Sequence, residues 1–398
     1  MKRAAPALDA ALAQLERSQL RRVRTTVEGC PAAGARALII EGGRELIDFS
    51  SNDYLGLAHH PALAAAMSAC AARRGAGSGA SHLVTGHGPE HAHLEEELAA
   101  FTGRARALLF STGYMANLAV MAALSGRGER VLLDRLCHAS LIDGARLSGA
   151  TLRRYAHADA DSAARLAAAD RERAALIATD GVFSMDGDLA PLPQLARIAA
   201  SLGAWLVVDD AHGLGVVGAS GRGVLEHFAL GSEAVPVLIG TLGKAFGSFG
   251  AFVAGDADLI EFLIQKARPY IYTTALPQPV AAATRAARAL LQAEGWRRER
   301  LHALTAYFRR AAHAAGVPLT ASSTPIQPIV LGSAACALAA QRELQQAGFW
   351  VVAIRPPTVP AGSARLRVTL SALHTEAELD ALVERLARAC LRERSTAA

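Results

Sequence analysis

The segment AWLVVDDAHG at residues 204–213 is followed, one apolar run later, by GTLGKAFG at residues 240–247. The first segment is an apolar run that ends in two aspartates and a histidine, and the second is a glycine-rich loop around a lysine. Ligands of open parallel α/β sheets bind at the carboxyl ends of the strands. The two segments therefore predict an α/β fold whose functional side chains follow its strands.

The same pattern continues on both sides of these segments. From about residue 104 to residue 255, short apolar runs alternate with amphipathic stretches. This alternation predicts a large domain with a mostly parallel sheet and helices on both faces. The expected strands are residues 107–110, 130–134, 175–180, 204–210, 236–240 and 250–255.

The two ends of the chain predict further elements around this sheet. The N-terminal part contains an arginine-rich helical segment and a hairpin at Glu41-Gly42-Gly43, whose glycines favour a tight turn. After a long helical stretch, a strand–helix–strand pattern and a final helix predict a smaller α+β domain. We therefore expect an N-terminal segment at 1–50, the large domain at 51–285 and a small C-terminal domain at 286–398.

Composition argues against several classes of protein. The 398 residues carry a formal net charge of +5, but the arginines are spread without an aromatic–basic stripe, so no nucleic-acid partner is expected. No window approaches the roughly 18 apolar residues of a membrane-spanning helix, so no membrane is expected. The five cysteines are scattered without a C-x-x-C pair, and the N-terminal stretch is charged, which favours a cytoplasmic protein without disulfides.

Lysine usage singles out one residue. Of the 41 lysines and arginines, only Lys2, Lys244 and Lys266 are lysines. Because arginine cannot supply a nucleophilic amine, a lysine in a glycine-rich loop is a candidate for a Schiff base with an aldehyde. A nucleotide-binding phosphate loop is disfavoured, because position 238 is leucine and Ala245 lacks the hydroxyl that binds magnesium.

The aspartate pair after the most apolar run predicts a second contact with an aldehyde cofactor, away from its aldehyde group. A carboxylate in this position needs a cation, and the protonated pyridine nitrogen of pyridoxal 5′-phosphate (PLP) is such a partner. We expect Asp209 rather than Asp210 in this role. Gly213-x-Gly215-x-x-Gly218 matches a dinucleotide-binding motif, but no helical pattern or acidic strand end follows it, so a Rossmann oxidoreductase is disfavoured.

Three further groups of residues have competing interpretations. Ser111-Thr112-Gly113-Tyr114 opens a helix whose backbone N–H groups suit a phosphate, although an ordinary helix start explains the same residues. Arg365 and Arg367 share one face of a strand and suit either a substrate carboxylate or a structural ion pair. Histidines 82, 87, 91 and 93 suggest a metal, but no cysteine or matching carboxylate completes the site, so no metal is expected.

Six segments together match one known family. They are SNDYLGL at 51–57, GSG at 77–79, DRLCHASL at 134–141, GVFSMDGD at 181–188, VDDAHG at 208–213 and GTLGKAFG at 240–247. With them, the chain resembles the α-oxoamine synthases from about residue 20 to residue 390. The resemblance implies a fold-type I PLP-dependent acyltransferase that works as a homodimer, with the active site at the interface.

The resemblance also implies roles for matching residues. Around the cofactor ring these are Lys244 as the residue that carries PLP, Asp209 at the pyridine nitrogen, His212 and Ser184 at the ring oxygen, and His138 stacked over the ring, where it also meets the substrate. Around the phosphate they are Gly113, Tyr114 and Thr241. For the substrates they are Asn52 and Arg367 at the amino-acid carboxylate and Thr358 and Arg21 at the acyl group, with Arg22 and Arg24 competing for the place of Arg21.

One segment narrows the choice of substrates. Residues 353–372 resemble the family members that join L-alanine to a pimeloyl thioester, carried by coenzyme A or by acyl carrier protein. The alternatives are a glycine-using member, such as 2-amino-3-ketobutyrate CoA ligase or 5-aminolevulinate synthase, and a non-catalytic binding protein on a PLP fold. In a homodimer, Thr273 or Thr274 would reach the partner subunit's phosphate site.

Overall fold

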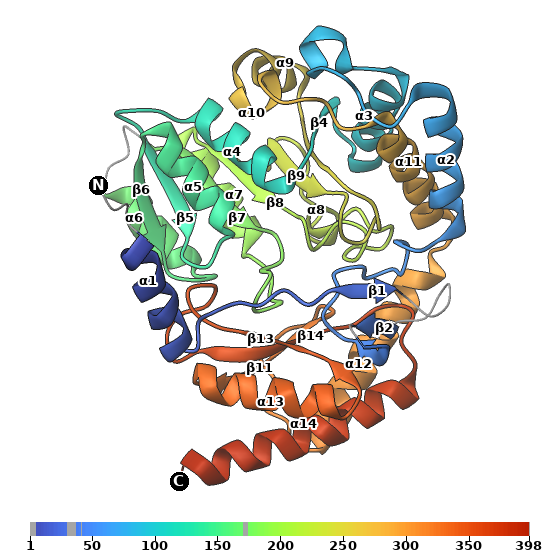
Figure 1. Ribbon diagram of the computed structural model, residues 1–398. Helices are drawn as coiled ribbons and strands as arrows, with labels where there is room; N and C mark the ends of the chain where they lie inside the picture. The colour runs from blue at the N-terminus through green and yellow to red at the C-terminus, as the bar shows by residue number, and fades with distance from the viewer. Residues whose placement is uncertain (1–4, 30–36, 41, 170–173, 398) are drawn as a thin grey trace. The chain divides into compact units, whose positions relative to one another are not determined.

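The computed structural model describes residues 5–29, 37–40, 42–169 and 174–397 (Figure 1). It divides into two compact units. Unit 1 comprises Met1–Ser51, Met185–Gly187 and Arg300–Ala398, and unit 2 comprises Asn52–Ser184 and Asp188–Glu299. The N-terminal residues therefore cluster with the C-terminal part of the chain. Lys2, Cys30 and Glu41 lie outside the described residues.

Unit 2 is built on a seven-stranded sheet with the order β4-β10-β9-β8-β7-β5-β6. Its strands are β4 (Arg106–Phe110), β5 (Arg130–Asp134), β6 (Thr151–Tyr155), β7 (Ala174–Asp180), β8 (Trp205–Asp209), β9 (Val237–Thr241) and β10 (Ala251–Gly255). The strands from β9 across to β6 pair in parallel, and β10 is antiparallel to both β4 and β9. The predicted, mostly parallel sheet is confirmed, and its parallel strands end along one edge.

The sequence pattern predicts six of these strands and misses β6. This strand has the sequence TLRRY, and its two arginines interrupt the apolar run. It lies at the edge of the sheet, where β5 is its one partner among the described strands and most of its side chains are partly or fully exposed. An edge strand tolerates charged residues, so an apolar run is not required there.

Helices cover both faces of this sheet (Figure 1). Side chains of α4 (Gly113–Leu124), α5 (Ala139–Ser148) and α9 (Ala257–Lys266) pack with alternate strand residues in one buried apolar cluster. Helices α3 (Pro89–Thr102) and α7 (Leu192–Leu202) contact the sheet on its other face. The remaining helical elements of unit 2 are α2 (Pro61–Arg74), η1 (His82–Gly86), α6 (Ala160–Ala168), α8 (Val224–His227), α10 (Arg268–Ile271) and α11 (Gln278–Ala293).

Unit 1 contains two smaller sheets, with the orders β1-β2-β3-β12 and β11-β14-β13. The predicted hairpin joins β2 to β3, and Gly42 and Gly43 in its turn both have positive φ. The elements are α1 (Ala5–Arg17), β1 (Val27–Gly29), β2 (Ala37–Ile40), β3 (Arg44–Asp48), most of α12 (Trp296–Ala314), β11 (Ile326–Gly332), α13 (Ala334–Gln346), β12 (Phe349–Trp350), β13 (Val352–Ile354), β14 (Ala364–Thr369) and α14 (Glu376–Ala397). Across the described ranges of both units, no helix has the length and apolarity to span a membrane.

Candidate active site

A chain of side-chain contacts links Asn52 to Lys244 at the carboxyl edge of the unit 2 sheet. Lys244 follows β9, and its Nζ lies 2.7 Å from Nε2 of His212, which follows β8. Nδ1 of His212 lies 2.7 Å from the hydroxyl of Tyr54, and this hydroxyl donates to Oδ1 of Asn52 at 3.3 Å. The contacts hold the lysine amine at the edge where parallel strands present ligand-binding residues.

The loop that carries Lys244 has a backbone requirement of its own. The N–H of Leu242 donates to the carbonyl of Gly250 across the loop at 2.9 Å. Gly247 has a φ of +61°, and a Cβ there would lie 2.4 Å from the backbone nitrogen of Ala58. Glycine satisfies both the left-handed conformation and the close approach. The loop therefore packs tightly against the segment that supplies the asparagine and tyrosine of the contact chain.

Asp209 ends β8 with a carboxylate group that is nearly buried, since the residue is 7% exposed. Its Oδ2 accepts a hydrogen bond of 2.7 Å from Nδ2 of Asn117, and its Oδ1 accepts one of 3.0 Å from the N–H of Ala211. Asn117 lies in α4 and also donates to the hydroxyl of Ser140 at 2.7 Å. The carboxylate is thus fixed by neutral donors, a setting that favours a cationic ligand group beside it.

Asp210 points into the protein instead. It is fully buried, its Oδ2 accepts a hydrogen bond of 2.8 Å from the N–H of Val224, and burial raises its pKa well above the ordinary value. Gly213 and Gly223 leave room for its carboxyl group, because a Cβ at these positions would lie 2.0 and 1.8 Å from a carboxyl oxygen. Gly213, the first glycine of the dinucleotide-like motif, therefore serves internal packing.

His138 immediately precedes α5 on the solvent side of the site. Its Nδ1 lies 2.6 Å from the hydroxyl of Ser140, and its backbone N–H donates to Oδ1 of Asp180 at 3.1 Å. The ring meets Tyr114 edge-on, with 6.5 Å between the ring centroids. Partial exclusion of water lowers the pKa of His138, although the carboxylate of Asp209 opposes this change. A neutral ring here is suited to stacking on a flat cofactor.

The start of α4 offers donors for a phosphate. Thr112 caps the helix with its side chain, and Gly113 and Tyr114 begin it, so their backbone N–H groups have no partners within the helix. A Cβ on Gly113 would meet no atom within 4 Å, which leaves the approach open. The last residue of β4 and Thr241 of β9 both pair with Ala251. The helix start and Thr241 therefore lie at the same end of the sheet.

The acyl-binding residues predicted from the sequence belong to unit 1. The hydroxyl of Thr358 accepts a hydrogen bond of 3.2 Å from Nη2 of Arg22. Arg21 forms an ion pair of 3.0 Å with Glu16 instead. Of these two competing arginines, Arg22 is the one in contact with the threonine.

The two arginines of β14 have different surroundings. Arg365 forms an ion pair of 2.5 Å with Asp186, which agrees with the structural interpretation of that residue. Arg367 lies two residues along the same strand and is buried. The contact of Arg367 with a substrate carboxylate stays a prediction.

Three of the four histidines noted in the sequence come together in unit 2. His82, His87 and His91 each place a ligand atom within 4.8 Å of the others. Nδ1 of His91 accepts a hydrogen bond of 3.0 Å from the N–H of Gly88, and its Nε2 lies 2.5 Å from the carbonyl oxygen of Leu276. Backbone groups thus engage both ring nitrogens of His91, and a metal ion would have to displace one of them.

The sequence alone predicts no role for Tyr54 or Asn117. Tyr54 belongs to the matched SNDYLGL segment, but nothing in the sequence indicates that its hydroxyl contacts the buried His212. Asn117 did leave a signal, since it is the one polar residue in the helical stretch MANLAVMAAL. A buried polar side chain in an apolar helix needs a hydrogen-bond partner, and here the partner is a carboxylate.

The donor set of unit 2 fits PLP. A lysine amine, a nearly buried carboxylate and a helix N-terminus lie along one sheet edge. The sequence profile described as aminotransferase class I and II matches residues 44–386. The chain belongs to the aminotransferase class I and II family. The match includes residues of both units.

Curated relatives narrow the grouping of this chain within the family. A protein of Methylococcus capsulatus named 8-amino-7-oxononanoate synthase is 59% identical over 355 residues, which are 89% of this chain and 92% of that protein. A protein of Pseudomonas aeruginosa with the same name is 60% identical over 349 residues, 87% of this chain and 86% of that protein. Within the aminotransferase class I and II family, the chain groups with these PLP-dependent acyltransferases.

Solved structures of similar proteins agree with this grouping. Serine palmitoyltransferase from S. paucimobilis, with PLP and myriocin bound, is 30% identical and superposes with a TM-score of 0.91 over 98% of both chains. The 8-amino-7-oxononanoate synthase of Francisella tularensis is 32% identical, with a TM-score of 0.78 over 88% of this chain and 99% of that chain. The predicted fold-type I architecture is confirmed, and PLP is the cofactor of this family member.

Proposed function

We propose that the protein condenses L-alanine with a pimeloyl thioester to give 8-amino-7-oxononanoate, carbon dioxide and the free thiol of the carrier, a step of biotin biosynthesis. The observation that carries the proposal is the contact chain of Asn52, Tyr54, His212 and Lys244, at the same sheet edge as Asp209. The names of the curated relatives support the same reaction.

The residues of unit 2 would hold PLP by its aldehyde, ring and phosphate. When bound, PLP supplies a ring that accepts the electron pair released at the α-carbon of the amino acid. Asp209 keeps a proton on the pyridine nitrogen, and neutral His138 stacks on the ring. The other proposed contacts are Lys244 with the aldehyde carbon, Ser184 and His212 with the ring oxygen, and Gly113, Tyr114 and Thr241 with the phosphate.

Lys244 is the proposed base and acid of the reaction. Its Nζ takes the α-proton of alanine and later returns a proton to the product. His212 orients this amine: if its Nε2 accepts from Nζ, its Nδ1 carries the ring hydrogen and donates to Tyr54, whose hydroxyl donates to Asn52. A chain of hydrogen bonds in one direction keeps the amine aimed at one place while its proton moves.

The contacts with the two substrates are also proposals. His138, beside the cofactor, and Asn52 of unit 2 would meet the amino acid, and Arg367 would pair with its carboxylate. The acyl chain would meet Thr358 of unit 1, with Arg22 or Arg21 beside it. The hydrogen bond from Arg22 to Thr358 supports Arg22 for this role. Coenzyme A and acyl carrier protein are both anionic, so either carrier suits a chain with a net charge of +5.

We also propose a homodimer in the cytoplasm. Thr273 and Thr274 line a small pocket together with His82 and Ser111, and they are the candidates to reach the partner subunit's phosphate site. The four cysteines within the described ranges are free thiols, as suits a reducing compartment. Sedimentation of the active enzyme tests the assembly, and full activity in a monomer would contradict it.

The visible absorption spectrum of the protein with PLP, before and after borohydride, tests the cofactor role. We expect a borohydride-sensitive band in the wild type that Lys244→Ala lacks. Lys266→Ala is the matched control, because Lys266 lies exposed at the end of α9 and its loss leaves the band in place. No band in the wild type after addition of PLP would contradict the proposal.

The same samples, incubated with pimeloyl-CoA, test the substrate. We expect 8-amino-7-oxononanoate from alanine and little turnover of glycine. A clear preference for glycine would favour a glycine-using α-oxoamine synthase, and turnover of neither amino acid would favour a binding protein.

A further inference from the structure

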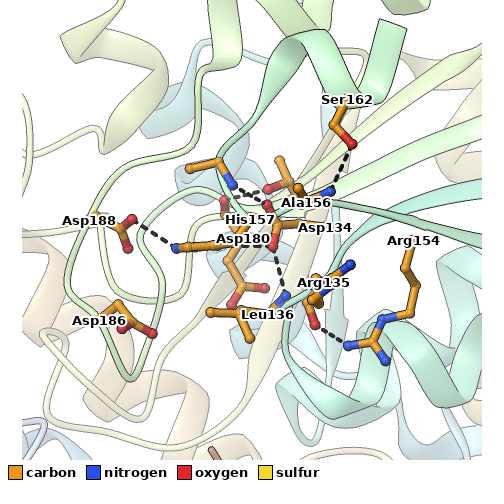
Figure 2. A network of polar contacts seen from close by, with 12 residues as sticks. Asp134, Arg135, Leu136, Arg154, Ala156, His157, Ser162, Asp180, Asp186 and Asp188 are labelled. Carbon is orange, nitrogen blue, oxygen red and sulfur yellow. Dashed lines mark hydrogen bonds and ion pairs between the residues drawn. The ribbon is translucent and has the colours of Figure 1, made fainter. Parts of the chain in front are cut away.

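His157 lies just after β6 and joins two carboxylates (Figure 2). Its Nδ1 lies 3.0 Å from Oδ1 of Asp134, and its Nε2 lies 2.9 Å from Oδ2 of Asp188. The side chain of Asp134 is fully buried, and that of His157 is 23% exposed. Each ring nitrogen faces a carboxylate oxygen, and an imidazole donates from both nitrogens only when it is protonated. The geometry therefore calls for an imidazolium, and we name these three residues the histidine bridge.

The surroundings of the histidine bridge stabilise this charge. Burial disfavours the charged ring, but the hydrogen bonds and charges of Asp134 and Asp188 outweigh it and raise the pKa of His157 to about 10. The ring is thus a cation at neutral pH. It balances two carboxylates that would otherwise face the same space without a cation between them.

The Asp134 side of the histidine bridge orders the loop that leads to His138. Oδ1 of Asp134 also accepts a hydrogen bond of 2.7 Å from the N–H of Leu136, and its Oδ2 accepts one of 2.8 Å from the N–H of Ala158. At the end of the same loop, the N–H of His138 donates to Asp180. Asp134 ends β5 and Asp180 ends β7, so two neighbouring strand ends fix the short loop between them.

The Asp188 side of the histidine bridge orders the turn that carries Ser184. The N–H of Phe183 donates to the carbonyl of Asp188 at 3.0 Å and closes the turn. The ring of His157 also meets the ring of Phe183 edge-on, with 4.4 Å between the centroids. His157 therefore contacts both residues that close the turn, and Ser184 is the next residue after one of them.

We propose that His157 is a positioning residue of the reaction, which fixes the loop before His138 and the turn around Ser184 by donating to Asp134 and Asp188 at once. The inference rests on the proposed function, because His138 and Ser184 matter through their contacts with PLP. Without the cation, the two carboxylates repel each other and both segments shift. A displacement of about 1 Å at a catalytic site can cost roughly 100-fold in rate.

The first test compares His157→Gln with Arg104→Gln, both as holoenzymes at a temperature where each is folded. Glutamine offers donors to one carboxylate and an oxygen to the other, so it cannot satisfy both. Arg104 is the control for lost stability: it is buried in the same unit and donates to the carbonyl of Val235 at 2.7 Å. We expect kcat with alanine to fall roughly 10- to 100-fold in His157→Gln, with KM for pimeloyl-CoA changed less than about threefold.

A second readout is independent of turnover. The visible circular dichroism of bound PLP reports the asymmetry of the groups around its ring, and we expect it to change in His157→Gln but not in Arg104→Gln. The proposal is overturned if His157→Gln keeps kcat within about twofold and the dichroism of the wild type, or if both variants lose activity equally. If the wild type itself does not use alanine, the proposed function is wrong. The dichroism of bound PLP still tests the role of His157 in that case, because it does not depend on turnover.

Chemical rescue tests whether both ring nitrogens matter. His157→Gly leaves a partly exposed space of the size of an imidazole, and added imidazole should restore part of kcat there. Protonated 1-methylimidazole donates from one nitrogen only, so we expect it to rescue far less. The assay measures 8-amino-7-oxononanoate rather than free thiol, because imidazole itself cleaves thioesters. Equal rescue by both compounds would overturn a bridge between two carboxylates.

Discussion

Asp134 and Asp209 end two strands of one sheet, yet their carboxylates are stabilised in different ways. Asp134 accepts two backbone hydrogen bonds and has the cation of His157 beside it. Asp209 accepts its hydrogen bonds from an asparagine side chain and a backbone N–H, which are neutral. The protein thus supplies the counter-charge of the carboxylate that holds loops, whereas the proposed counter-charge of Asp209 comes with the cofactor.

Because of this difference, we expect Asp134 to contribute mainly to the stability of the protein and Asp209 mainly to its activity. A paired, buried carboxylate contributes to the folded state, and removal of one partner is costly because the other charge stays buried. A buried carboxylate that is hydrogen-bonded by neutral donors contributes less to folding and is kept for what it binds. Substitutions of the two aspartates should therefore move activity and stability in different proportions.

Asp209→Asn should have the largest effect on activity. Asparagine keeps the size of the side chain but removes the charge that we propose holds a proton on the pyridine nitrogen, so kcat should fall roughly 10²- to 10³-fold. The melting temperature of the protein without PLP should stay the same or rise. Steady-state kinetics and thermal unfolding measure the two quantities, and a large loss of stability with intact kcat would break the comparison.

Asp134→Asn should reverse these proportions. His157 loses one of its two carboxylates at a fully buried position, so the free energy of unfolding should fall by roughly 3–5 kcal/mol. Activity at a permissive temperature should fall about tenfold, through the loop that leads to His138. Denaturant titration of both aspartate variants gives the stabilities, and a variant as stable as the wild type would refute the role of Asp134 as half of a buried ion pair.

The pH dependence of stability should report the histidine bridge. The folded pKa of His157 is about 10, above the value of roughly 6.5 in an unfolded chain. A raised pKa stabilises the folded state fully below the unfolded value and loses this contribution as pH rises through the folded value. The melting temperature of the wild type should therefore exceed that of His157→Gln most at pH 6.5 and least near pH 10. A difference that grows toward pH 10 would contradict a bridging imidazolium.

Arg106→Gln should have the smallest effect. Arg106 begins β4 and pairs with Glu261 at 3.1 Å, but the two side chains are 42% and 54% exposed. Exposed ion pairs contribute little because water and salt screen them. We expect kcat and the melting temperature to match the wild type, and a pronounced loss of either would mean that exposure does not distinguish this pair from the histidine bridge.

The sequence predicts the strands that lead to Asp209 and Thr241, because each strand is a buried apolar run that is followed by a glycine-bearing turn. The sequence gives no signal for β6, because the two arginines of TLRRY interrupt its apolar pattern. His157 follows this strand, so its position cannot be predicted without it. The link from Tyr54 to His212 spans 158 positions, and only the folded chain brings the two side chains together. Periodicity identifies elements, whereas pairings of this kind depend on tertiary packing.

The parallel pairing of β3 with β12 has a consequence for synthesis. Strand β3 ends at Asp48, and its partner β12 begins at Phe349, 301 positions later in the sequence. At about 5–20 residues per second, a ribosome takes roughly 15–60 s to cover this distance. During that time β3 of the nascent hairpin lacks its partner β12. An unpaired strand edge can pair with other chains and cause aggregation unless a chaperone covers it. The sheet that β1, β2 and β3 begin is thus completed only after β12 has been synthesised.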